Sequence, residues 1–312
     1  MVLFQSRLII QSIGNMDTLY KYVDQNGAIK MIADCTLKYT APHALNDPFD
    51  LFIDDLMNYD EIDIKRRRLK LYLDFIKSKP FDYFLNVHSG IDSWFLQSNI
   101  GRFSQTLNEL KDHEYTDLIE GMCRDLDIKF PFNIPKQDNS IIIDPIANCG
   151  VFCATKNIRS ILMWSHYAEG HKGAIVGISR DCVHQDAPLM DVIYSNSRVS
   201  FYDTVTEHTL NKINNIDSTV DKFTERALLS KSNDWSYEQE VRSVILDVNR
   251  KGNSFYLHNI DPSMIKELYI GVKSDDKFTN YITSLAKIRN QNCQIFKVGM
   301  ERYSYDLNFT PI

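Results

Sequence analysis

Two glutamates separated by one residue, Glu238 and Glu240, precede the stretch Val241-Arg242 and Ser243-Val244-Ile245-Leu246, whose valines and isoleucine are typical of a buried strand. Alternate side chains of an extended chain share a face, so the sequence predicts that both carboxylates point to the same side. Unpaired carboxylates are rarely buried, which places the pair at a strand end. Two such groups could divide acid and base roles or bind a ribose hydroxyl. Alternatively, they pair with Lys231 and Arg242 at a solvated strand end.

A second group of reactive side chains lies in residues 161–173 and comprises Trp164, Ser165, His166, Tyr167 and His171. Five residues along a helix turn the second histidine about 140° away from the first. Zinc helices use a spacing of four, so we expect no metal here. Trp164 and Tyr167 are instead expected to stack against a ring, with Ser165 or His166 donating hydrogen bonds. The alternative is a helix whose aromatic face packs in the core.

Two shorter motifs could add polar groups to the same site. The loop 46–50, Asn-Asp-Pro-Phe-Asp, is rich in turn formers, and Asp47 is expected either at the site rim or in the turn itself. Lys21 and Tyr22 lie on an expected early strand. Lys21 could meet a phosphate or a carboxylate, or it could be an ordinary exposed lysine.

The overall composition predicts a folded protein and limits its partners. Among 312 residues there are 16 Tyr and 17 Phe, which argues against disorder, and the net charge of −6 predicts no global surface for nucleic acid. The basic run 65–68 is expected to be a solvated helix face. Six cysteines without a Cys-x-x-Cys pair favour a reduced, cytoplasmic setting. No apolar run is long enough to span a bilayer, so we expect no membrane partner.

The hydrophobic pattern predicts an α+β fold with a mainly antiparallel, split sheet core and flanking helices. We expect residues 1–17 to be an N-terminal extension, 18–51 and 141–312 to form the core domain, and 52–140 to be a helical insertion with a linker. Within the core, strands are expected at 18–23, 36–40, 150–155, 174–179, 189–194, 254–258, 265–271 and 293–298, and helices at 203–231 and 275–290.

The motifs in combination resemble a large prokaryotic family of unknown function. The resemblance consists of Leu-Tyr-Lys-Tyr from residue 19, Leu-Asn-Asp-Pro-Phe-Asp from residue 45, Met-Trp-Ser-His-Tyr-Ala-x-x-His-x-Gly from residue 163, and Lys-x-x-x-Trp-x-Tyr-Glu-x-Glu-x-Arg from residue 231. It covers residues 18–275 apart from the insertion. The family suggests no activity.

The Glu-x-Glu motif by itself resembles that of the ADP-ribosyltransferases. By that resemblance, Glu240 is the catalytic residue that holds the nicotinamide ribose, and Glu238 assists the acceptor. Ser165 or Tyr167 takes the place of the middle motif. Lys21 stands where that family has His or Arg. The resemblance implies NAD as substrate, a split antiparallel sheet, and a protein or nucleic-acid acceptor.

Three functions follow as alternatives. The first is an ADP-ribosyltransferase-like enzyme acting on a nicotinamide dinucleotide, in the setting of antiviral (phage) defence. The second is a ligand-binding or sensor module without catalysis, which recognises a small nucleotide. The third is a metal-dependent nuclease that uses Asp47, Glu238 and Glu240. The sequence leaves the oligomeric state open.

Overall fold

The computed structural model describes residues 17–51, 146–200, 203–204, 221–246, 248 and 252–312. The chain divides into two compact units, one comprising 1–52, 142–198 and 228–312 and the other 53–141 and 199–227. The sheet and the candidate site lie in the first unit. The helical insertion and linker expected at 52–140, the basic run 65–68 and residues 1–16 of the expected extension lie outside the described residues and stay predictions.

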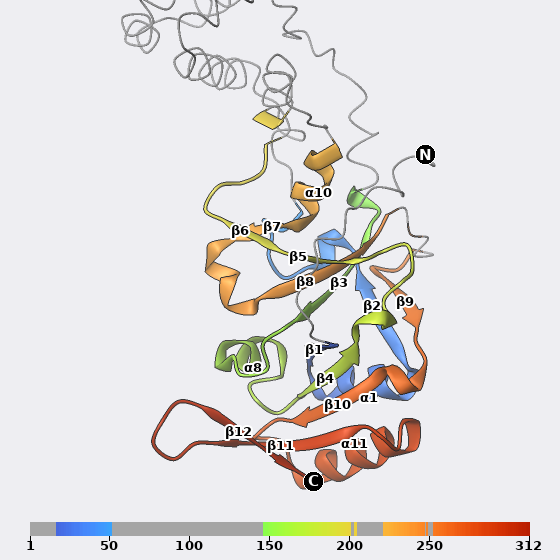
Figure 1. Ribbon diagram of the computed structural model, residues 1–312, viewed down its shortest axis with the longest axis vertical. Coiled ribbons are helices and arrows are strands. Elements are labelled where there is room, and N and C mark those ends of the chain that lie inside the picture. Colours follow the sequence, from blue (N-terminus) through green and yellow to red (C-terminus); the bar gives the residue numbers. More distant parts are fainter. Residues whose placement is uncertain (1–16, 52–145, 201–202, 205–220, 247, 249–251) are drawn as a thin grey trace, which may run out of the picture. The chain divides into compact units, whose positions relative to one another are not determined.

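The first unit is built on a ten-stranded, mainly antiparallel sheet, which confirms the expected α+β class (Figure 1). Its main path runs β12-β11-β10-β4-β1-β3-β2-β9, while β8 pairs with β3 and β5 pairs with β8. The strands are β1 (Thr18–Val23), β2 (Thr36–Thr40), β3 (Gly150–Thr155), β4 (Ala174–Ser179), β5 (Leu189–Asp191), β8 (Glu240–Ile245), β9 (Phe255–Asn259), β10 (Ile265–Ile270), β11 (Gln294–Met300) and β12 (Leu307–Pro311). A separate parallel pair consists of β6 (Ile193–Ser195) and β7 (Ser230–Ser232).

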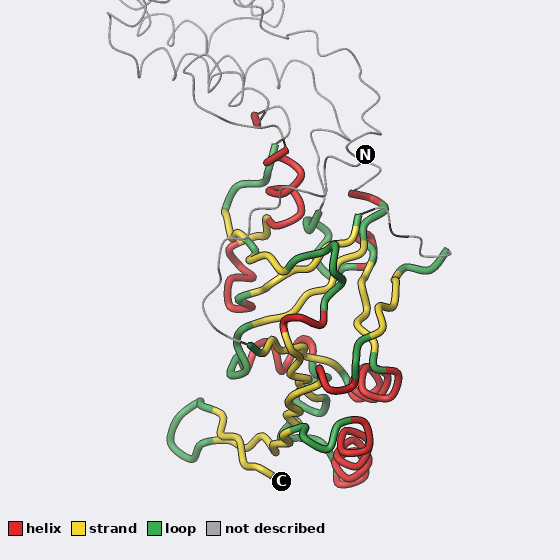
Figure 2. Tube along the Cα trace, turned by 45° about the vertical axis from the view of Figure 1, so that its right-hand side comes forward, coloured by secondary structure: helices red, strands yellow, loops and turns green. Residues whose placement is uncertain are grey.

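Helices cover both faces of the sheet. The α-helices are α1 (Gln25–Asp34), α8 (Ile161–Tyr167), α10 (Asp221–Leu229) and α11 (Asp276–Arg289), and the short 3-10 helices are η1 (Pro42–Ala44), η2 (Arg180–Cys182), η3 (Asn233–Glu238) and η4 (Pro262–Met264). Figure 2 shows α1 and α11 side by side, and these two helices are in contact. They pack on one face of the sheet, and α8 packs on the other.

The two cores follow from the alternation of side chains along each strand. In β1, Leu19 and Val23 face the core beneath α1 and α11, whereas Tyr20 and Tyr22 face the core beneath α8. β10 repeats this pattern, because Leu268 and Ile270 join the first core and Tyr269 joins the second. Both faces of these strands therefore contribute apolar or aromatic side chains to a core.

The pairing between β1 and β3 in this sheet is short. β1 pairs with β4 over six residues but meets β3 only where Tyr20 lies opposite Thr155. β3 then pairs with β8 along its full length. β1 and β3 therefore meet only at the end of β3 where Thr155 also lies opposite Glu240 of β8.

Several expected elements differ from the structure. The strand expected at 189–194 is two strands, β5 and β6, which pair with different partners on either side of Val192. The helix expected to continue to residue 231 ends at Leu229, and the next residues form β7. β12 had no counterpart in the prediction. The division at Val192 and the formation of β7 depend on strand partners that are distant in sequence, whereas β12 pairs with the preceding strand β11.

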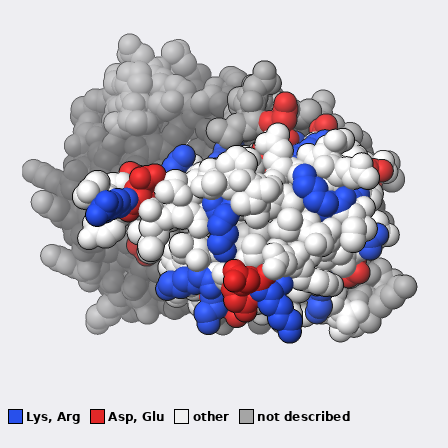
Figure 3. Space-filling model, turned by 90° about the horizontal axis from the view of Figure 1, so that it is seen from below, with Lys and Arg blue, Asp and Glu red and all other residues white. Residues whose placement is uncertain are grey.

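Charged side chains do not gather into one basic surface on the face shown in Figure 3. Lys and Arg lie there in separate groups among uncharged side chains, with Asp and Glu between some of them. In the described part of the chain, the helices are too short or too polar to cross a membrane.

Candidate functional site

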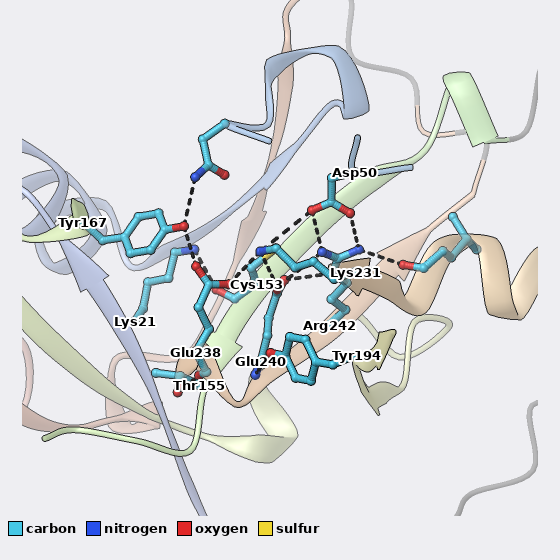
Figure 4. A network of polar contacts seen from close by, with 12 residues as sticks. Lys21, Asp50, Cys153, Thr155, Tyr167, Tyr194, Lys231, Glu238, Glu240 and Arg242 are labelled. Atoms are coloured by element: carbon cyan, nitrogen blue, oxygen red, sulfur yellow. Dashed lines mark hydrogen bonds and ion pairs between the residues drawn. The ribbon is translucent and has the colours of Figure 1, made fainter. Parts of the chain in front are cut away.

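Five charged side chains form a buried cluster where β8, η3 and the loop after η1 meet, which we call the charge network (Figure 4). Its members are Asp50, Lys231, Glu238, Glu240 and Arg242, each exposed by 8% or less. Three carboxylates thus face two cations in a region with little water. Charges so placed are stable only when they are paired and hydrogen-bonded.

Arg242 is fully buried, and all five of its N–H donors have partners. Nε donates to Glu240 Oε1 at 2.8 Å, and Nη2 donates to Glu240 Oε2 at 3.2 Å. Nη1 and Nη2 donate to the two oxygens of Asp50 at 2.8 and 2.6 Å. The remaining Nη1 donor reaches the Leu228 carbonyl at 2.9 Å, at the end of α10. This guanidinium therefore joins three separate segments of chain.

Lys231 bridges the two glutamates of the Glu-x-Glu motif. Its Nζ donates to Glu238 Oε2 at 2.6 Å and to Glu240 Oε2 at 2.9 Å, and it lies 3.9 Å from Asp50 Oδ2. The same ammonium group lies 5.1 Å from the centre of the Trp235 ring, a cation–π contact. Lys231 thus holds both carboxylates and supports the ring above them.

Strand pairing sets these positions. The parallel pair β6–β7 places Tyr194 opposite Lys231, and β3–β8 places Cys153 opposite Arg242. Glu240 and Arg242 are two residues apart in β8, so they share a face and meet within the strand. The Tyr194 hydroxyl accepts a hydrogen bond from the Glu240 N–H at 2.8 Å.

The chain between the two glutamates is not extended, so the predicted reason for their proximity is wrong. Glu238 ends η3, Gln239 adopts a left-handed conformation with φ of 45°, and Glu240 begins β8. The Thr155 hydroxyl fixes this corner by donating to the Glu238 carbonyl at 2.5 Å. The carboxylates converge because both bind Lys231, and they are buried rather than at a solvated strand end.

The two glutamates differ in acidity. Burial, the largest influence, raises the pKa of both, but for Glu240 the attraction of Arg242 and Lys231 outweighs it and holds the pKa well below the ordinary 4.5. For Glu238 burial prevails over Lys231, and its pKa is raised. Glu240 therefore stays ionised while Glu238 is the first of the pair to take up a proton.

Polar side chains line the outer end of the charge network, where Glu238 lies. The Tyr167 hydroxyl donates to Glu238 Oε1 at 2.5 Å and accepts from Asn46 Nδ2 at 2.9 Å. Burial and then this bond to Glu238 raise the pKa of Tyr167. Lys21 approaches from β1, and its Nζ donates to the Cys153 carbonyl at 2.6 Å (Figure 4).

Four rings lie beside this outer end and form what we call the aromatic surface: His166 and Tyr167 from α8, and Trp235 and Tyr237 from η3. His166 is exposed and the other three are partly exposed. The His166 ring centre lies 6.3 to 6.5 Å from those of the other three, and Trp235 lies 6.1 Å from Tyr237. The rings already touch one another, so a ligand ring would pack on their outer sides.

Other predicted site residues have structural contacts. Trp164 is fully buried, with its ring against Tyr22 and its Nε1 donating to the Ile158 carbonyl, so the expected stacking role does not suit it. Tyr22 is buried in the same core. Ser165 and His171 form a separate pair, Oγ to Nε2 at 3.1 Å.

The loop 46–50 contributes different residues from the one expected. Asp47 Oδ1 accepts from the Phe49 N–H at 2.9 Å, so it closes the turn. Asp50 enters the charge network and Asn46 reaches Tyr167. Both residues belong to the Leu-Asn-Asp-Pro-Phe-Asp motif, so the sequence contains the signal for them. Trp235 and Tyr237 were likewise part of the quoted motif but were not chosen as site residues.

The three carboxylates of the charge network are held by Lys231 and Arg242. In the described residues there is no group of three or more His, Cys, Asp or Glu arranged to hold a metal ion. Of the residues named for the nuclease alternative, Asp47 closes its own turn, while Glu238 and Glu240 bind Lys231.

We expect Asp50→Asn to lower the free energy of unfolding by about 3–5 kcal/mol, because it removes one of the two carboxylates that bind the buried Arg242 through both oxygens. The matched control is Lys156→Ala. It breaks a 2.5 Å pair with Asp191 whose side chains are 24% and 49% exposed, and it should cost less than about 1 kcal/mol. Urea denaturation measures both variants, and equal losses would contradict a structural role for the network.

The ionised form of Glu240 should stabilise the fold above its ordinary pKa of 4.5, because its folded-state pKa is lower. This contribution is lost as the pH falls below that value. The free energy of unfolding of Glu240→Gln should therefore fall less steeply than that of the wild type between about pH 5 and about pH 3. Urea denaturation across this range tests the expectation, and parallel curves would refute it.

Comparison with known proteins gives one match. No curated protein and no solved structure matches the chain. Residues 163–243 match the model of a family described as a protein of unknown function (DUF2971). The matched segment runs from α8 to β8, so it includes all four rings of the aromatic surface and four of the five members of the charge network. The segment is thus similar to a family of unknown function, and the ADP-ribosyltransferase resemblance stays a prediction.

Proposed function

We propose that this protein is a ligand-binding module that recognises a planar ring, such as a nucleotide base, at the aromatic surface. The observation that carries the proposal is the exposure of His166 together with partly exposed Tyr167, Trp235 and Tyr237, directly beside a buried charge network. Ordinary packing would bury such rings, and clustered exposed aromatic side chains are typical of binding sites.

The charge network supports ring binding by holding the rings of the aromatic surface in place. Tyr167 is held through its hydroxyl by Glu238 and Asn46, and Trp235 packs on the Lys231 ammonium. Side chains fixed in this way lose little conformational entropy when a ligand binds. Rings held before binding therefore favour recognition of a flat partner.

The network also argues against a simple catalytic role for Glu240. Its carboxylate is 4% exposed and accepts from Arg242 at both oxygens and from Lys231 at one. A substrate hydroxyl would have to displace one of these cations. Binding without catalysis requires no such rearrangement.

Trp235→Ala should weaken binding of a ring ligand by roughly tenfold or more, since loss of an aromatic anchor costs about 1–3 kcal/mol. Calorimetric titration with adenosine, AMP, ADP-ribose and NAD measures this. The matched control is Tyr281→Ala, which removes a 53% exposed ring from α11. The control should bind as the wild type does. Equal effects of the two variants, or no binding to any ligand, would refute the proposal.

A second candidate is ADP-ribosyl transfer from NAD. It is supported by the convergence of both glutamates at the start of β8, with Lys21 approaching the same end from β1. Glu240 would hold the nicotinamide ribose and Glu238 would assist the acceptor, with a protein or nucleic acid as that acceptor. A setting in antiviral defence remains part of this candidate.

If transfer occurs, Glu240→Gln should abolish release of nicotinamide from labelled NAD while circular dichroism still reports a folded protein. Tyr281→Ala again serves as the matched control and should retain turnover. Wild-type protein that neither binds nor consumes NAD would eliminate this candidate, without affecting the ring-binding proposal if another ring binds.

A further inference from the structure

The charged groups around the aromatic surface influence whether it favours a positive, neutral or negative ring. The carboxylate of Glu238 lies behind Tyr167, and the exposed Asp234 directly precedes Trp235 in η3. Lys231 lies behind Trp235, but its ammonium charge is shared by Glu238 and Glu240 at 2.6 and 2.9 Å. The charge network by itself carries three negative and two positive charges.

The rings themselves are rich in electrons. Trp235 already accepts one cation, because the Lys231 ammonium lies 5.1 Å from its centre. The Tyr167 hydroxyl donates a hydrogen bond to the Glu238 carboxylate at 2.5 Å, which shifts electron density toward the ring. The faces of electron-rich rings attract cations.

Lys21 is the described cation that opposes this attraction. Its Nζ donates to the Cys153 carbonyl at 2.6 Å and lies 5.5 Å from the centre of the Phe152 ring, so two contacts already orient it toward β3. Among the described residues, the carboxylates of the network pair with Lys231 and Arg242 and not with Lys21, and the exposed Asp234 accepts from Ser232 Oγ at 3.2 Å. The groups next to Trp235 therefore favour a positive ligand.

We propose that the ring bound at the aromatic surface belongs to a cationic planar group, of the amidinium, guanidinium or pyridinium class. This inference rests on the ring-binding function proposed above and adds the sign of the ligand's charge. Stacking on Trp235 and Tyr237 provides the contact area, and Glu238 with Asp234 provides the charge preference.

Three matched probes test the charge preference: benzamidinium, benzamide and benzoate, which share one ring and carry charges of +1, 0 and −1. Binding is followed by the indole NMR signal of Trp235, assigned with Trp235→Phe, at constant ionic strength. Benzamidinium should bind about three- to tenfold more tightly than benzamide, and benzoate most weakly. The preference should shrink when salt is added, because exposed charges are screened.

A variant at the exposed carboxylate separates charge from stacking. Asp234→Asn should lower the affinity ratio of benzamidinium to benzamide by about twofold or more while leaving benzamide binding unchanged. Asp186→Asn, at another exposed carboxylate, is the matched control and should leave the ratio unchanged.

The outcomes separate the two proposals. Equal binding of benzamidinium and benzamide overturns the charge inference and leaves ring binding intact. Preference for benzoate also overturns it. If none of the three probes binds and nucleotides also fail to bind, the proposed function itself is refuted.

Discussion

The burial of Arg242 is the constraint on which the rest of the site depends. A guanidinium cannot lose its charge inside a protein, so a fully buried one must find partners for all five donors. Here those partners come from β8 itself, from the loop that contains Asp50 and from the last turn of α10. Any rearrangement that separates these segments would leave the buried charge of Arg242 without partners. One side chain thus ties together pieces of chain that are distant in sequence.

This constraint limits what the glutamates can do. Glu240 is held by Arg242 and Lys231, whereas Glu238 lies at the end of the network and meets Tyr167. The freedom to meet a ligand consequently belongs to the rings on η3 and α8, which the network holds in place. The left-handed Gln239 is part of the same arrangement, because it turns the chain sharply enough for both carboxylates to reach one ammonium.

The α+β class, the mainly antiparallel sheet and many strands could be predicted because side-chain alternation and turn residues are local signals. The functional motifs were also found, yet several residues within them were given the wrong emphasis. Asp47 closes a turn and Asp50 enters the network, although both belong to the same loop. A three-residue shift along an irregular loop changes which carboxylate faces the core, and no periodic pattern reveals that direction.

The sequence by itself determined which residue types are available to the site: two glutamates beside an apolar strand, a basic residue on each side of them, and a concentration of aromatic side chains. The tertiary structure decided how they are used. β6–β7 pairing brings Lys231 beneath Trp235, and β3–β8 pairing buries Arg242 next to Glu240. The physical reason is that a carboxylate's role depends on its distance from cations and water, and contacts between segments far apart in sequence set both.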